Sequence, residues 1–228
     1  MRKKACVLLS GGLDSVVSAF YTQKYKAAVE FCLFFDYGQK AFIQEKKACE
    51  YYANLLNAKL YTIKLPFLKE ITGTALVNTH SVPSIDLNDL QDNSITTQSM
   101  LDVWVPNRNG LFLNIAGSFA DSKNINYIIT GFNKEEAQTF KDNSKSFINS
   151  INKCFKFSTL ISPTVYSPFY SKDKSYMIKT ALKLNIPLNR LYSCYNGYKK
   201  MCGICESCVR LKRALSNNDI AFNHYFEI

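Results

Sequence analysis

The stretch that most constrains the fold of this chain is a glycine-containing hexapeptide at residues 10–15, Ser-Gly-Gly-Leu-Asp-Ser. An apolar run at residues 5–9 precedes it, and short apolar runs bounded by glycine are typical of buried strands. After it, apolar residues recur at the spacing of one face of an amphipathic helix, namely Leu13, Val16, Val17, Phe20 and Tyr21. The sequence therefore predicts a strand, a glycine turn and a helix in direct succession.

This turn has the features of an anion-binding pocket. Two adjacent glycines let a backbone approach a ligand closely, and the start of the following helix directs N–H groups and the positive end of its dipole toward the turn. The hydroxyls of Ser10 and Ser15 add donors. The carboxylate of Asp14 would repel a bare phosphate, so we expect it either to hold a metal ion next to the phosphate or to cap the helix.

The hexapeptide lacks the Gly-Lys-Ser/Thr ending of a Walker loop. It resembles the pyrophosphate loop of the N-type ATP pyrophosphatases. That resemblance implies an adenine nucleotide α-hydrolase-like fold and cleavage of ATP between its α and β phosphates, which gives an adenylated substrate and pyrophosphate. We expect nucleotide contacts along the loop, the first turns of the helix and the end of the next strand, namely Leu9, Ser10, Gly11, Gly12, Leu13, Asp14, Ser15, Val16, Val17, Ser18, Ala19 and Asp36.

The rest of the chain alternates between strand and helix patterns. We expect further strands at 29–35, 59–65 and 125–130, a strand or extended segment at 161–166, and helices at 146–157 and 174–184. Two more helices are expected where apolar residues within 48–56 and within 112–120 fall on one face. This alternation predicts an α/β fold with a doubly wound, mainly parallel sheet, in which ligands bind beyond the carboxyl ends of the strands. Asp36 follows such an end, although a helix cap or a turn would also explain it.

Between residues 66 and 103 the periodicity breaks down, and residues 81–99 are polar without a clear period. We expect a long loop here, and such loops in compact domains are usually functional or mobile. A lid over the site and an oligomer contact are both compatible with this composition.

Length and composition indicate one large domain with a full core, because the chain has 228 residues of which 47% are hydrophobic and 20% charged. No apolar run approaches the ~20 residues of a membrane span, and the polar residues from Ser10 onward interrupt the N-terminal apolar stretch too early for a signal peptide. We therefore expect a cytoplasmic protein with no membrane partner.

The net charge of +10 favours anionic partners, and its scattered distribution favours phosphorylated small molecules over nucleic acid.

Four of the eight cysteines lie close together with the spacing C-x7-C-x2-C-x2-C, namely Cys194, Cys202, Cys205 and Cys208. The x2 spacing lets neighbouring sulfurs converge on one ion, and four thiolates form a closed tetrahedral site for structural zinc. An iron–sulfur cluster uses related spacings and stays an alternative, whereas disulfides do not fit a reducing compartment.

We expect an α/β domain at 1–188 and a C-terminal zinc-binding segment at 189–228. The other cysteines lie singly in apolar surroundings and are expected to be buried, namely Cys6, Cys32, Cys49 and Cys154.

The loop at 10–15, the stretch Ser-Cys-Tyr-Asn-Gly at 193–197 and the cysteines at 202–208 together resemble the 7-cyano-7-deazaguanine synthase family of the queuosine pathway. Residues 35–39, 105–109 and 131–133 match that family in the same order, so the resemblance covers about residues 4–215. Two departures are mild: Tyr198 stands where the family often has glycine, and Lys141 where it commonly has proline.

This resemblance implies a carbon–nitrogen ligase that uses ATP to convert 7-carboxy-7-deazaguanine and ammonia into 7-cyano-7-deazaguanine. Adenylation gives the carboxylate carbon a leaving group, ammonia then forms an amide, and adenylation of the amide oxygen permits elimination to the nitrile. Mg²⁺ and backbone donors at residues 10–15 would stabilise the departing pyrophosphate. The resemblance also implies a homodimer.

Several single residues are candidates for roles in this chemistry. For catalysis we expect Asp14, Arg108 and Lys174, because a guanidinium suits planar oxyanions and a lysine at a helix start can contact a phosphate. Candidates for binding the deazaguanine are Asn107, Arg108, Asn133 and Asp142. A surface ion pair for Arg108, a solvated lysine at 174 and turn roles for the others remain open.

Two other functions compete with this one. The first is another ATP pyrophosphatase, such as a tRNA thiolation enzyme with iron–sulfur chemistry, but the chain shows neither an appended RNA-binding domain nor a catalytic cysteine in a matching context. The second is a zinc-knuckle RNA-binding protein without enzymatic activity. It would require clustered basic residues interleaved with aromatic ones, and only Tyr195 and Tyr198 suggest this.

Overall fold

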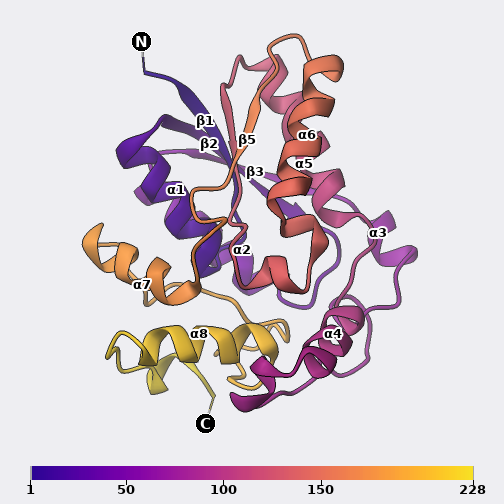
Figure 1. The fold of residues 1–228 in the computed structure, drawn as a ribbon, viewed down its shortest axis with the longest axis vertical. Coiled ribbons are helices and arrows are strands. Elements are labelled where there is room, and N and C mark those ends of the chain that lie inside the picture. The colour runs from indigo at the N-terminus through magenta and orange to yellow at the C-terminus, as the bar shows by residue number, and fades with distance from the viewer. Residues whose placement is uncertain (1, 228) are drawn as a thin grey trace.

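The computed structural model describes residues 2–227 and is built around a five-stranded parallel sheet (Figure 1). The strands are β1 (Lys4–Leu8), β2 (Ala28–Asp36), β3 (Lys59–Lys64), β4 (Tyr127–Ile129) and β5 (Thr164–Tyr166). Their order is β3-β2-β1-β4-β5, and every neighbouring pair is parallel. This confirms the doubly wound parallel sheet, although β4 and β5 are shorter than the sequence pattern predicts.

Helices cover both faces of the sheet (Figure 1). The helices of the described residues are α1 (Leu13–Tyr25), α2 (Phe42–Leu55), α3 (Phe67–Glu70), α4 (Asn93–Asp102), α5 (Arg108–Ser122), α6 (Lys145–Ser158), α7 (Lys174–Lys183) and α8 (Glu206–Ser216). Of these, α1, α2, α5 and α6 pack directly against strands. Because successive strand residues point to opposite faces, Ala5 and Val7 of β1 share a core with α1, α2 and α7, whereas Cys6 shares one with α5 and α6.

The C-terminal segment joins the first of these cores. In α8, Leu211, Ala214 and Leu215 are buried in the same apolar cluster as β1 and α1. α8 packs on α7, which in turn packs on α1. The cysteine-bearing segment is therefore fixed to the helix layer that carries the glycine loop.

The expectation of a long loop at 81–99 is wrong. A 3₁₀ turn at Asn88–Gln91 leads into α4, whose N-cap Asp92 accepts hydrogen bonds from the N–H groups of Ser94 (2.8 Å) and Ile95 (3.3 Å). The spacing of apolar residues does not predict this helix, because the residues that it buries are polar, namely Thr96 and Ser99. The same segment pairs with the cysteine region, since Ile85 N–H donates to the carbonyl of Ile204 over 2.9 Å.

Two smaller expectations also need correction. Cys154 is exposed, whereas Cys6, Cys32 and Cys49 are buried as expected. Helix α6 turns Phe155 into the core, and the preceding position lies about 100° away around the helix axis. Leu55, expected on the buried face of α2, is 49% exposed at the end of that helix. Among residues 2–227, no helix combines the length and apolarity needed to cross a membrane.

Candidate active site

The site lies where the strand order reverses, between the carboxyl ends of β1 and β4. The connections that follow these two strands run to opposite faces of the sheet, which leaves a crevice between them. A cavity lies there, and residues from both strand ends, from the start of α5 and from the segment after α7 line it. They include Leu8, Leu9, Ser10, Gly12, Asp14, Ser15, Leu33, Phe34, Phe35, Tyr37, Thr130, Gly131, Phe132, Tyr192, Ser193 and Tyr195.

The glycine loop after β1 is held in shape by its own hydroxyls. Ser15 Oγ accepts the N–H of Ser10 over 3.1 Å and donates to the carbonyl of Gly12 over 3.2 Å. Gly11 has a φ of +79°, and a Cβ there would lie 2.6 Å from the Cβ of Ala48, so the loop sits directly on α2. The expected strand, glycine turn and helix are thereby confirmed.

The loop after β4 approaches the start of α1 equally closely. A Cβ on Gly131 would lie 2.7 Å from the backbone nitrogen of Ser15 and 2.8 Å from the carbonyl carbon of Asp14. Contact this close is possible only without a side chain. The two loops therefore form one continuous floor at the N-terminus of α1.

Asp14 is the most unusual group in this floor. Its Oδ2 accepts a hydrogen bond from the Lys174 ammonium, whereas its Oδ1 is buried and has no hydrogen-bond partner among the described residues. Burial raises the pKa of Asp14 to about 7, against the opposing effect of Lys174. An unpaired buried oxygen is costly, so the free oxygen fits a bound cation or donor, and Mg²⁺ is a cation that takes such oxygen ligands.

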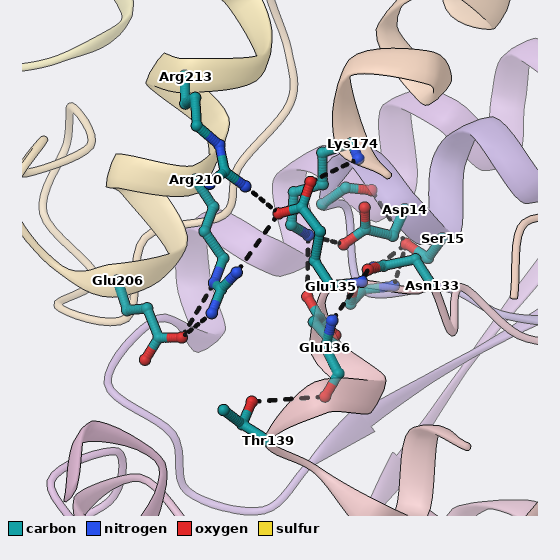
Figure 2. Close-up of polar contacts among 12 residues, drawn as sticks. Asp14, Ser15, Asn133, Glu135, Glu136, Thr139, Lys174, Glu206, Arg210 and Arg213 are labelled. Carbon is teal, nitrogen blue, oxygen red and sulfur yellow. Dashed lines mark hydrogen bonds and ion pairs between the residues drawn. The ribbon is translucent and has the colours of Figure 1, made fainter. Parts of the chain in front are cut away.

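Lys174 belongs to a larger set of buried and half-buried charges (Figure 2). Its ammonium also donates to Glu136 over 2.8 Å, and its backbone N–H donates to Glu135 over 3.0 Å. The second oxygen of Glu135 pairs with Arg210 and Arg213 of α8. Neither glutamate is predicted from the sequence, because Glu136 begins a short 3₁₀ helix, Glu135 directly precedes it, and the stretch has no apolar period.

Aromatic side chains and a guanidinium form a further part of the lining. Phe35 and Phe112 stack with their ring centroids 3.9 Å apart, and Arg108 donates a hydrogen bond of 3.2 Å to the hydroxyl of Tyr37. Asn107 adopts a left-handed backbone conformation with φ 51°, and α5 begins directly after it at Arg108. This part of the cavity suits a flat ring that carries an anionic group.

A carboxyl group lies in the same cavity. Gln39 Nε2 donates to Glu45 Oε2 and to the carbonyl of Phe35, each over 2.9 Å. Burial raises the pKa of Glu45 to about 7. Part of this lining could be expected from the sequence, because Tyr37 and Gln39 closely follow the carboxyl end of β2, where ligands bind in such sheets.

The expected site residues fall into three groups. In the cavity lining are Leu9, Ser10, Gly12, Asp14, Ser15 and Arg108. Buried behind that lining, in the loop and in α1, are Gly11, Leu13, Val16, Val17, Ser18 and Ala19. Outside the lining but adjacent to it in sequence or by contact are Asp36, Asn107, Asn133, Asp142 and Lys174.

Two residues of the last group stabilise turns. Asp36 Oδ1 accepts the N–H of Gly38 over 3.2 Å, and Asn133 Oδ1 accepts the N–H groups of Glu135 and Glu136 over 3.0 and 3.1 Å. Short polar side chains commonly stabilise turns in this way. These contacts set the backbone next to the cavity.

The four clustered cysteines converge as their spacing predicts. Their sulfur atoms all lie within 4.8 Å of one another, and those of Cys202 and Cys208 are 3.9 Å apart. A tetrahedral zinc site with Zn–S bonds of about 2.3 Å places its sulfurs about 3.8 Å apart. The N–H of Cys202 points at the sulfur of Cys194 over 3.3 Å, which favours a thiolate. The donor set therefore fits a closed metal site.

Comparison with known proteins decides the family. A family model described as "Queuosine biosynthesis protein QueC" matches residues 4–219. The chain belongs to this family. The family resemblance seen in the sequence is thereby confirmed, and the match favours neither of the competing functions.

Relatives in the QueC family are similar over nearly their whole length. The 7-cyano-7-deazaguanine synthase of Carboxydothermus hydrogenoformans is 46% identical, over 95% of this chain and 100% of the relative. The corresponding protein of Methanosarcina mazei is 44% identical, over 94% of each chain. Among solved structures, NMN synthetase from Francisella tularensis aligns with a TM-score of 0.48 at 14% identity, over 100% of this chain and 88% of that one.

Proposed function

We propose that this chain is a 7-cyano-7-deazaguanine synthase, which uses ATP to convert 7-carboxy-7-deazaguanine and ammonia into the nitrile. Membership of the QueC family over residues 4–219 carries this proposal. The first adenylation releases pyrophosphate and activates the carboxylate, ammonia then displaces AMP to form an amide, and a second adenylation lets the amide lose AMP to become a nitrile.

We assign the nucleotide to the floor formed by the two loops. The backbone N–H groups at the start of α1 and the hydroxyls of Ser10 and Ser15 would bind the phosphates. Asp14 would hold Mg²⁺ through its unpaired Oδ1, and the ion would neutralise charge on the departing pyrophosphate. Lys174 would orient the Asp14 carboxylate through Oδ2.

We place the deazaguanine against the aromatic part of the cavity. Arg108 is the group best suited to pair with its carboxylate, because the guanidinium lines the cavity beside Tyr37 and Phe112. For Asn107 and Asp142 we propose support rather than direct contact. Asn107 precedes the first residue of α5, and Asp142 accepts a hydrogen bond from Asn143, which lines the cavity, over 3.3 Å.

We assign structural zinc to the four cysteines, since four sulfur ligands leave no open position for water or substrate.

A cytoplasmic location suits three buried thiols without disulfide partners, at Cys6, Cys32 and Cys49. A homodimer would have apolar surface available near the end of α6, where Phe157 is 93% and Leu160 is 96% exposed.

The test combines purified protein with ATP, Mg²⁺, ammonium and 7-carboxy-7-deazaguanine, and follows the products by mass spectrometry. We expect the nitrile together with AMP and pyrophosphate. A folded protein that contains its metal and yields no nitrile would overturn the proposal, and a thiolated tRNA product in a parallel assay would favour the competing pyrophosphatase function.

A further inference from the structure

The carboxylate of Glu135 joins two helices that belong to different parts of the chain (Figure 2). Its Oε1 accepts the backbone N–H of Lys174, the first residue of α7, over 3.0 Å. Its Oε2 accepts hydrogen bonds from Arg210, over 3.4 Å, and from Arg213 in α8. Glu135 is only 8% exposed, so both oxygens are used inside the protein.

On the α8 side, the arginines extend from a helix that starts within the cysteine cluster. Cys205 is the N-cap of α8 and Cys208 lies in its first turn, so the converging sulfurs fix where this helix starts. Arg210 is held further by Glu206, which accepts from its Nε over 2.9 Å and from its Nη2 over 2.7 Å. A guanidinium fixed on one side by Glu206 presents its other edge to Glu135.

On the α7 side, the contact sets the position of a single ammonium group. Because Glu135 holds the backbone N–H of Lys174, it fixes the start of α7 from which that side chain extends. The Lys174 ammonium then reaches Asp14 and Glu136. The cysteine cluster is thus connected to the glycine loop through α8, Glu135 and Lys174, with a direct contact at every step.

The charges of this network are unequal. It contains the carboxylates of Asp14, Glu135, Glu136 and Glu206 but only the three cations of Lys174, Arg210 and Arg213. Of the oxygens of these four carboxylates, only Asp14 Oδ1 is both fully buried and without a hydrogen-bond partner. The network therefore favours a further cation next to Asp14 Oδ1. Lys174 must remain paired with Asp14 Oδ2 for this, because it holds the carboxylate in position.

We propose that Glu135, held by Arg210 and Arg213, is a positioning residue that keeps Lys174 against Asp14 and so couples the cysteine-bearing helix α8 to the nucleotide loop. The inference that this coupling affects turnover rests on the proposed function. Misplacement of a reacting group by about 1 Å costs up to about 100-fold in rate, so loss of this contact should lower turnover without removing any group that touches the substrate.

The variant best suited to the test is Arg213→Ala, because the Arg213 side chain is 28% exposed and its loss leaves Arg210 in place. Arg213→Lys retains the charge and should restore most of the function. The matched control is Glu30→Gln, which removes one partner of a surface ion pair with Lys4, of 3.7 Å, on the sheet. Metal content and melting temperature are measured for every variant.

The first readout needs no ligand. The rate at which an amine-reactive acetylating reagent modifies Lys174 is followed by mass spectrometry of peptides. We expect Lys174 to be protected in the wild type, Arg213→Lys and Glu30→Gln proteins, and to react faster in Arg213→Ala at unchanged metal content. Equal protection in Arg213→Ala would overturn the proposed coupling.

The second readout is steady-state pyrophosphate release. We expect kcat to fall about 10- to 100-fold in Arg213→Ala, with recovery in Arg213→Lys. Faster modification of Lys174 with unchanged kcat would show that the contact is only structural, and so would a loss of kcat that follows metal loss and is not restored by lysine. If the wild type itself forms no nitrile while Lys174 protection still depends on Arg213, the proposed function fails and the positioning contact stands.

Discussion

The buried Lys174 forms an ion pair with Asp14 although 160 positions separate them in the chain. The pair joins the first turn of α1 to the first residue of α7. Lys174 is 4% exposed and is the only described cation within ion-pair distance of Asp14 and Glu136. The stability of the fold and the state of the nucleotide loop therefore depend on the same ammonium group.

Replacement of this lysine should destabilise the protein. Lys174→Met leaves the half-buried carboxylates of Asp14 and Glu136 without a counter-charge. Breaking a fully buried ion pair costs about 3–5 kcal/mol, which is the upper limit expected here. Urea unfolding measures the loss, with Lys179→Met on the exposed side of α7 as the control. A difference between the two variants below about 1 kcal/mol would contradict a structural role for the pair.

Asp14→Asn should abolish most turnover while the protein stays folded. An amide is a weaker cation ligand than a carboxylate, and the loss of metal-assisted charge stabilisation costs several kcal/mol, or about 100-fold and more in rate. Pyrophosphate release is measured over a range of Mg²⁺ concentrations. Asp121→Asn is the control, because the Asp121 carboxylate accepts two backbone N–H groups at Leu160 and Ile161, away from the site. Similar rates for both variants would remove Asp14 from the mechanism.

Disruption of the cysteine cluster should lower both metal content and stability. In Cys208→Ser one of four converging ligands is lost, and binding free energy at a structural metal site contributes to folding. We expect less than one metal ion per chain and a lower melting temperature, and we expect a strong chelator to act similarly on the wild type. Cys154→Ser changes an exposed cysteine outside the cluster and should behave as the wild type does.

Glu45 should make the stability of the protein depend on pH. Burial raises its pKa from 4.5 to about 7, so the folded chain binds this proton more tightly than the unfolded chain. The resulting stabilisation is complete below about pH 4.5 and is lost as the pH rises through 7. Glu45→Gln has no carboxyl to titrate at this position and therefore lacks this pH-dependent stabilisation.

The free energy of unfolding of the wild type, relative to Glu45→Gln, should therefore fall on the order of 1–2 kcal/mol between about pH 5 and pH 8. Urea unfolding at several pH values measures it. Glu50→Gln, an exposed position on the same helix, should show no such trend. A flat difference for Glu45→Gln would show that the carboxyl has an ordinary pKa.

A single methyl group at Gly131 should disturb the nucleotide site. In Gly131→Ala the new Cβ would meet the backbone of Asp14 and Ser15 at 2.8 and 2.7 Å, so the two loops must separate. We expect affinity for a non-hydrolysable ATP analogue to fall by about 10-fold or more. Gly73→Ala, where a Cβ meets nothing within 4 Å, is the matched control. Equal affinities would place the nucleotide elsewhere.

The sequence predicts the parts of this protein that rest on local patterns. The loop at residues 10–15 follows a strand and begins a helix, and the spacing of the cysteines brings four sulfurs together. Both features lie within short stretches, where hydrophobic period and residue spacing determine geometry.

The remaining features depend on distant partners. Glu135 is significant only because Arg210 and Arg213 meet it from 75 and 78 positions further along the chain. Likewise, α4 was missed because it buries threonine and serine rather than apolar residues. No local pattern reveals contacts of this kind.

The position of the two arginines in the chain has a consequence for synthesis. All five strands and the glycine loop precede Cys205, so every residue of the sheet is synthesised before α8. Only when residues 205–213 have emerged can Arg210 and Arg213 reach Glu135. The contact that positions Lys174 is thus the last part of the site to be completed during synthesis, because it waits for a helix near the end of the described residues.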